Sequence, residues 1–150
     1  MLPRFSHHRK SDGGLSTGVA RLWAGWPIER AIYLFVGVVF LAVFVQVTLY
    51  HWRQNFRHWS MWIPVIATPA LGLVALLLAW QNMPWLRALL GLLSAAGIVS
   101  GLAGTYFHVA GVGERVDGYN LNNFMVGPPP ALPVLVSALS VLALMGLYLA

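Results

Sequence analysis

The sequence contains no cysteine in its 150 residues. This absence excludes disulfide bonds, thiolate metal sites, iron–sulfur clusters and covalent attachment of c-type haem. Lysine is nearly absent as well, because the only one is Lys10, near the N-terminus. No apolar segment therefore offers a lysine that could form a Schiff base with a substrate or cofactor.

Charge is scarce, since Asp, Glu, Lys and Arg together make up 9% of the residues, where soluble domains carry about 25%. The long apolar runs hold no ionisable carboxylate or base of the kind that proton-coupled and sodium-coupled transporters display. The sequence also shows no serine–histidine–aspartate set, phosphate-binding glycine loop or HExxH helix. These absences argue against an independent transporter or hydrolase, and we expect no catalytic activity of the chain's own.

What the sequence does contain is apolar length, with a mean hydropathy of +0.72. Four runs of twenty residues, at 31–50, 61–80, 88–107 and 131–150, contain no charged side chain. Twenty helical residues rise about 30 Å, which matches the hydrocarbon core of a bilayer. The sequence therefore predicts an all-α integral membrane protein, a four-transmembrane-helix bundle with helices near 28–52, 61–81, 86–108 and 131–149.

The N-terminal part differs in composition from the rest. Residues 1–27 are predicted to form a cytoplasmic basic tail followed by a short amphipathic interfacial helix over 15–26, and residues 28–150 form the transmembrane domain. The basic pI of about 10.3 indicates membrane topology rather than nucleic-acid binding. Six basic residues are expected on the cytoplasmic side and three outside, which places both termini in the cytoplasm of a plasma (inner) membrane: Arg4, Arg9, Lys10, Arg21, Arg30 and Arg87 against Arg53, Arg57 and Arg115. The basic tail is expected to contact lipid headgroups.

Small residues follow one face of the third predicted helix at Gly97, Gly101 and Gly104. Such a stripe lets another backbone approach closely. The matching face of the first helix carries Phe40 and Phe44. We therefore expect the first helix to pack on the third, with these two aromatic rings against the glycines.

Two short stretches resemble each other, Thr48–His51 and Thr105–His108, and each ends a helix that crosses in the same direction. The resemblance suggests a two-helix duplication offset by 57 residues and places the two histidines at equal depth near the outer face. Imidazoles at that position either ligate haem iron or a metal, or are ordinary interfacial residues. Packing without a ligand is the preferred interpretation.

Other polar residues accompany the histidines. If the first helix continues through 51–60, one face carries Gln46, Tyr50, Arg53 and Arg57. Gln46 and Tyr50 suit a quinone headgroup, and Arg53, Arg57 or Arg115 suits a haem propionate. The simpler interpretation of Gln46 is a hydrogen bond to another helix.

Two functions follow as hypotheses. The first is a small non-catalytic subunit that stabilises a larger membrane complex, such as a respiratory or photosynthetic electron-transfer complex, with other membrane subunits and lipid as partners. The second is a redox subunit that binds b-type haem or quinone near the outer face through His51 and His108. A small channel or carrier is a third, weaker hypothesis.

Overall fold

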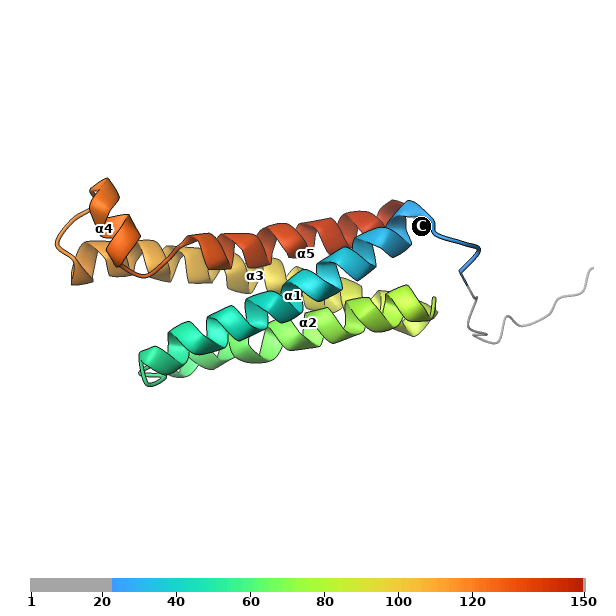
Figure 1. Ribbon diagram of the computed structural model, residues 1–150, viewed down its shortest axis with the longest axis horizontal. Helices are drawn as coiled ribbons and strands as arrows, with labels where there is room; N and C mark the ends of the chain where they lie inside the picture. Colours follow the sequence, from blue (N-terminus) through green and yellow to red (C-terminus); the bar gives the residue numbers. More distant parts are fainter. Residues whose placement is uncertain (1–22, 150) are drawn as a thin grey trace, which may run out of the picture.

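The structure, a computed structural model, describes residues 23–149 and is helical throughout, with no strand in that range (Figure 1). The elements are α1 (Ile28–Arg53), the short 3-10 helix η1 (Trp59–Met61), α2 (Trp62–Trp80), α3 (Pro84–Arg115), α4 (Leu121–Val126) and α5 (Ala131–Leu149). Four of these segments are long and apolar enough to cross a membrane: α1, η1 with α2, α3 and α5. The all-helical prediction and its four long helices are therefore confirmed.

The first helix ends at Arg53, close to its predicted end at 52, whereas the third helix differs from the prediction. The alternative continuation of the first helix through 51–60 does not occur, because Asn55 and Phe56 adopt φ of 53° and 45° and so turn the chain out of the helix after Arg53. Arg57 consequently leaves the polar face predicted for it. The third helix runs to Arg115 instead of ending near 108, and the loop that follows contains α4, which apolar periodicity alone did not indicate.

The segment before α1 caps the end of α2. The predicted interfacial helix over 15–26 lies largely outside the described residues, and its described part, 23–26, is not helical. The Trp23 indole Nε1 donates to the Leu78 carbonyl at 3.0 Å, and the Arg30 guanidinium donates to the Ala79 carbonyl at 3.0 Å. These bonds satisfy carbonyls that the last turn of α2 leaves without helical partners.

The four long helices form two close pairs, α1 with α2 and α3 with α5, named here the first pair and the second pair. In the first pair the backbones approach at Gly37 and Gly72, where a Cβ added to Gly37 would lie 3.0 Å from the Gly72 carbonyl oxygen. In the second pair, a Cβ added at Gly101 would lie 2.7 Å from the Pro133 carbonyl oxygen. Glycine thus permits both approaches, because any larger residue would push the helices apart.

This pairing corrects the expectation that the first helix packs on the third. Gly97 lies against Ser140 of α5 and Leu71 of α2, and Gly104 lies against Pro133 of α5. Phe40 is instead fully buried in the core between the pairs, and Phe44 is partly buried against the same core. The glycine stripe of α3 was predicted to contact aromatic rings, but it contacts serine and proline residues of α5. These smaller residues let the backbones of α3 and α5 approach more closely.

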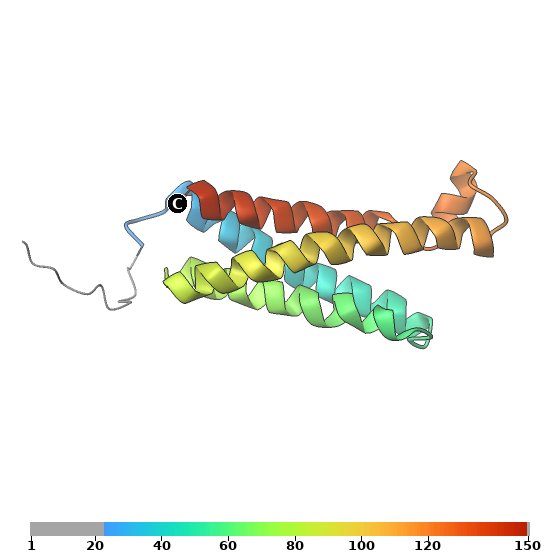
Figure 2. The same ribbon diagram turned by 180° about the vertical axis from the view of Figure 1, so that it is seen from behind.

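The two pairs meet at one end of the bundle and diverge towards the other, as both views show (Figures 1 and 2). At the joined end, the ring of Tyr33 on α1 reaches Gly146 of α5, and the short connection 81–83 links α2 to α3. The divergent end, where α1 and α3 finish, carries His51, His58 and His108 and is named the histidine end.

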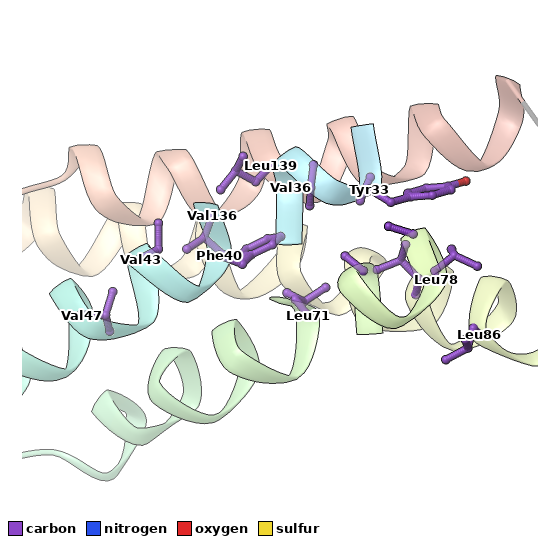
Figure 3. Packing of buried hydrophobic residues seen from close by; sticks show 14 of the residues in the cluster. Tyr33, Val36, Phe40, Val43, Val47, Leu71, Leu78, Leu86, Val136 and Leu139 are labelled. Carbon is purple, nitrogen blue, oxygen red and sulfur yellow. The ribbon is translucent and has the colours of Figure 1, made fainter. Parts of the chain in front are cut away.

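Apolar side chains fill the space between the pairs up to the point where they diverge (Figure 3). Tyr33, Phe40, Leu71 and Leu78 are all at most 1% exposed, and Figure 3 shows them between the helices. Close van der Waals packing of these side chains favours association of the helices, and in a bilayer it replaces the hydrophobic effect because lipid tails are equally apolar. The packed region therefore holds the pairs together and leaves the histidine end as the place where a cavity forms.

Candidate functional site

A cavity of about 510 Å³ lies at the histidine end, between the first and the second pair. Its walls come from the ends of α1 and α3, the beginnings of α2 and α5, and the connections that join them. Apolar and small residues line its deeper part: Val47, Gly101, Gly104, Leu132, Pro133 and Val136. The volume falls within the range of about 300–1,000 Å³ that sites for small molecules and cofactors occupy.

His51 reaches the cavity from the first pair. Its side chain is only 9% exposed, and its Nδ1 atom is buried without a hydrogen-bond partner in the described residues. The ring lies 6.4 Å from that of Phe56, which in turn stacks on Trp62 at 4.2 Å. Aromatic packing therefore holds this imidazole in place without using its polar atoms.

His108 reaches the same cavity from the second pair. Its Nδ1 lies 2.7 Å from the Pro129 carbonyl oxygen. A carbonyl oxygen only accepts hydrogen bonds, so Nδ1 is the nitrogen that carries the proton, and Nε2 keeps its lone pair. This is the arrangement found in metal-binding histidines, where the second ring nitrogen donates to a carbonyl and fixes the orientation of the ring.

The two imidazoles, which are 57 positions apart in sequence, line the same cavity. The structure thus brings together the two histidines that the similar stretches singled out, even though the helices that carry them do not form a pair. The two pairs diverge at the histidine end, and His51 and His108 line the cavity that forms between them, although α1 and α3 do not pack directly on each other.

Polar groups bridge the two pairs at the mouth of the cavity. The Arg115 guanidinium at the end of α3 donates to Gln54 Oε1, just after α1, at 3.2 Å. The Arg57 guanidinium donates to the same oxygen at 3.3 Å. Both contacts are exposed, and of the two arginines only Arg115 lines the cavity, together with Glu114.

His58 also lines the cavity but has another role. Its Nδ1 caps η1 by accepting from the Ser60 backbone N–H at 3.3 Å, and the same atom lies 2.8 Å from the Ser60 hydroxyl. The side chain is exposed. No group of three or more His, Cys, Asp or Glu side chains within residues 23–149 is arranged to hold a metal ion. The cavity thus offers two buried or half-buried imidazoles rather than a complete set of metal ligands.

The remaining predicted cofactor residues lie in a different place. Gln46, Tyr50 and Arg53 line a shallow groove of about 480 Å³ on the outward face of α1, together with Leu49 and Trp52. Gln46 and Arg53 are exposed, and neither takes part in a side-chain hydrogen bond among the described residues. The predicted single site is therefore two sites, and Tyr50 lines both.

Sequence reasoning missed three contributors to the cavity: the Pro129 carbonyl, Gln54 and the start of α5. The triple proline 128–130 indicated a stiff entry into the last helix, but not that it turns a carbonyl towards His108. Gln54 carried no pattern that marked it, because its contacts arise only from the turn at Asn55 and Phe56.

No known protein family, curated protein or solved structure matches this chain. The fold places it in the class of four-helix chains whose helices are long and apolar enough to cross a membrane.

Proposed function

We propose that this chain is an integral membrane protein of the plasma (inner) membrane and acts as a small, non-catalytic subunit of a larger membrane complex. In this proposal the outward face of α1 docks onto another subunit. The observation that carries it is the polar stripe Gln46–Tyr50–Arg53 on that face, whose side chains make no hydrogen bond within residues 23–149.

The position of Gln46 along α1, relative to the membrane surface, indicates that the stripe needs a partner. Gln46 lies seven residues before Arg53, which corresponds to about 10 Å along the helix axis. With Arg53 at the level of the lipid headgroups, the exposed amide of Gln46 lies within the hydrocarbon, where a polar group without a hydrogen bond is costly. A hydrogen bond to a helix of another subunit would remove that cost.

Charge favours a different subunit over a second copy of this chain. A symmetric pair of α1 helices would place Arg53 against Arg53, since residues on a two-fold interface meet themselves or their neighbours. We therefore expect the partner helix to carry a carboxylate near the level of Arg53 and a hydrogen-bonding side chain near the level of Gln46. The basic bias of the cytoplasmic loops supports an orientation with both termini inside.

The test is purification of the full chain in mild detergent, with a photo-reactive residue in place of Gln46. We expect a stoichiometric partner whose cross-link maps to a membrane helix with a carboxylate at the level of Arg53. Q46L should weaken the association, while T48V, whose hydroxyl already bonds to the Phe44 carbonyl of its own helix at 2.7 Å, should retain it. A chain that runs alone, or a Q46L variant that keeps its partner, would refute the proposal.

A quinone is the second candidate occupant of the same groove. Gln46 and Tyr50 together present an amide and a phenol to a space of about 480 Å³ that opens towards the membrane. A quinone ring would accept hydrogen bonds from both. Quenching of tryptophan fluorescence by a short-chain quinone, lost in Q46L and kept in T48V, would favour this occupant over a protein helix.

A further inference from the structure

We propose that the cavity at the histidine end binds an iron tetrapyrrole of the b type, with His51 and His108 as its two axial ligands. This inference does not rest on docking through α1, because His51 and His108 line only the cavity, although Tyr50 lines both the cavity and the groove. It assigns to the chain a cofactor-binding function that a purely structural subunit would lack.

The argument begins with the number of protein ligands. A bare zinc or copper ion needs three or four protein ligands, and residues 23–149 offer no such group. A tetrapyrrole supplies four equatorial nitrogens itself and needs only one or two axial groups from the protein. Two imidazoles, one from each helix pair, meet that requirement. They are too few to bind a bare metal ion.

The state of each imidazole supports the same assignment. His108 donates from Nδ1 to the Pro129 carbonyl and so presents Nε2 with a free lone pair. His51 is nine-tenths buried, lines the cavity and leaves Nδ1 without a partner in the described residues. A buried polar ring with unused hydrogen-bonding capacity normally has an unobserved partner. Coordination of iron would use the free lone pair of His108 Nε2 and a ring nitrogen of His51.

The rest of the cavity matches the two ends of such a molecule. The deep wall formed by Val47, Gly101 and Val136 is apolar and suits the flat ring. The guanidinium group of Arg115 lies on the lining of the cavity, and it shares Gln54 Oε1 as acceptor with Arg57, which is not on the lining. Guanidinium groups form strong, charge-assisted hydrogen bonds to carboxylates, so the rim suits the two carboxylate side groups of haem b.

Titration of the purified full chain with hemin, followed by the Soret absorption, tests the assignment. We expect saturation at one hemin per chain and the spectrum of six-coordinate, low-spin iron. H51A and H108A should each give a high-spin spectrum and an affinity lower by at least about tenfold, since even the loss of an outer-shell group costs about 10–100-fold. Added imidazole should restore the low-spin spectrum.

Matched controls separate the assignment from trivial outcomes. The double variant H51A/H108A and empty detergent micelles should bind hemin only without saturation. Helical circular dichroism of each variant shows whether it is folded, and H51Q and H108Q serve if either alanine variant is not. Non-saturable binding by the wild type, or equal binding by the double variant, would overturn the proposal. So would loss of the low-spin spectrum in H58A with retention in H51A.

The role of the rim has its own test. R115Q should lower the affinity for hemin several-fold but leave the affinity for hemin dimethyl ester unchanged, because the ester lacks the carboxylates that Arg115 would bind. An equal loss for both probes would show that Arg115 acts on the cavity's shape instead. No change for hemin would remove Arg115 from the site.

Discussion

The helices of the first pair and those of the second pair contact each other through different residues, and this difference affects how each pair presents its histidine to the cavity. In the first pair, Gly37 and Gly72 meet glycine against glycine, with flexible leucines beside them. In the second pair, glycines meet Ser137, Ser140 and Pro133, and the Ser137 hydroxyl donates to the Ile98 carbonyl across the pair at 3.2 Å. In the first pair, the side-chain hydrogen bond between the helices, from Arg30 to the Ala79 carbonyl, lies at the joined end, whereas the bond of the second pair lies beside Gly101 in the wall of the cavity.

The histidines follow the same contrast. His108, in the second pair, is tied by a hydrogen bond to the Pro129 carbonyl, whereas His51, in the first pair, has an unpartnered Nδ1. One wall of the cavity is therefore oriented in advance, and the other is held only by aromatic packing. Substitutions at the contacts within and between the pairs test whether the two pairs differ in this way.

The largest effect is expected from G101A. The added Cβ would lie 2.7 Å from the Pro133 carbonyl oxygen and 2.9 Å from the Ser137 nitrogen, and neither backbone atom can move without shifting α5. Overpacking of this kind costs typically about 1–3 kcal/mol, and we expect the upper end. Thermal unfolding in detergent measures it, with G91A as the control, because a Cβ there meets only Leu147 at 3.5 Å. Equal stability of the two variants would contradict the close contact.

G37A should cost less, about 1–2 kcal/mol, although it also crowds a helix contact. The atom nearest to the added Cβ is Leu76 Cγ at 2.6 Å, which belongs to a side chain that can change rotamer. The backbone obstacle, the Gly72 carbonyl oxygen, lies at 3.0 Å. The same unfolding assay applies, and a loss greater than that of G101A would reverse the ranking of the two pairs.

S137A removes the one side-chain hydrogen bond between α3 and α5. Hydrogen bonds between membrane helices contribute about 0.6 kcal/mol on average, and we expect a loss of that size. S140A is the matched variant, since the Ser140 hydroxyl donates to the Val136 carbonyl of its own helix at 2.8 Å. A larger loss in S140A than in S137A would show that the hydroxyl bond between the helices does not distinguish the second pair.

The smallest effect on stability is expected from R115Q, because the contact of Arg115 with Gln54 is exposed. Exposed substitutions usually change stability by no more than about 0.5 kcal/mol. Unfolding in the absence of hemin should therefore barely change. A marked loss of stability would mean that the bridge at the mouth holds the two pairs together, and that the packed core alone does not.

The long helices were predictable because charge-free runs of about twenty residues leave the backbone no alternative in an apolar setting. The pairing of the helices could not be predicted in the same way. A stripe such as Gly97–Gly104 indicates that another helix approaches closely, but it does not identify that helix. The bulk of Phe40 and Phe44 suggested the wrong one. The serines and proline of α5, which fit the glycines, resembled ordinary residues of an apolar run.

The candidate site was predictable in part for a similar reason. The two similar stretches indicated His51 and His108, and the structure brings both to one cavity. Helical periodicity on α1 grouped Gln46 and Arg53 with them, yet these residues point to the other side of the helix. The bond between His108 and Pro129 depends on how the proline segment folds back, which local sequence does not determine.

The central claim is that one histidine from each pair serves a single ligand, and electron paramagnetic resonance of the hemin-loaded chain tests it most directly. The wild type should show the low-spin ferric signal that two imidazole ligands produce, and H51A and H108A should each show the high-spin signal instead. A low-spin signal that survives in either folded single variant would contradict the claim.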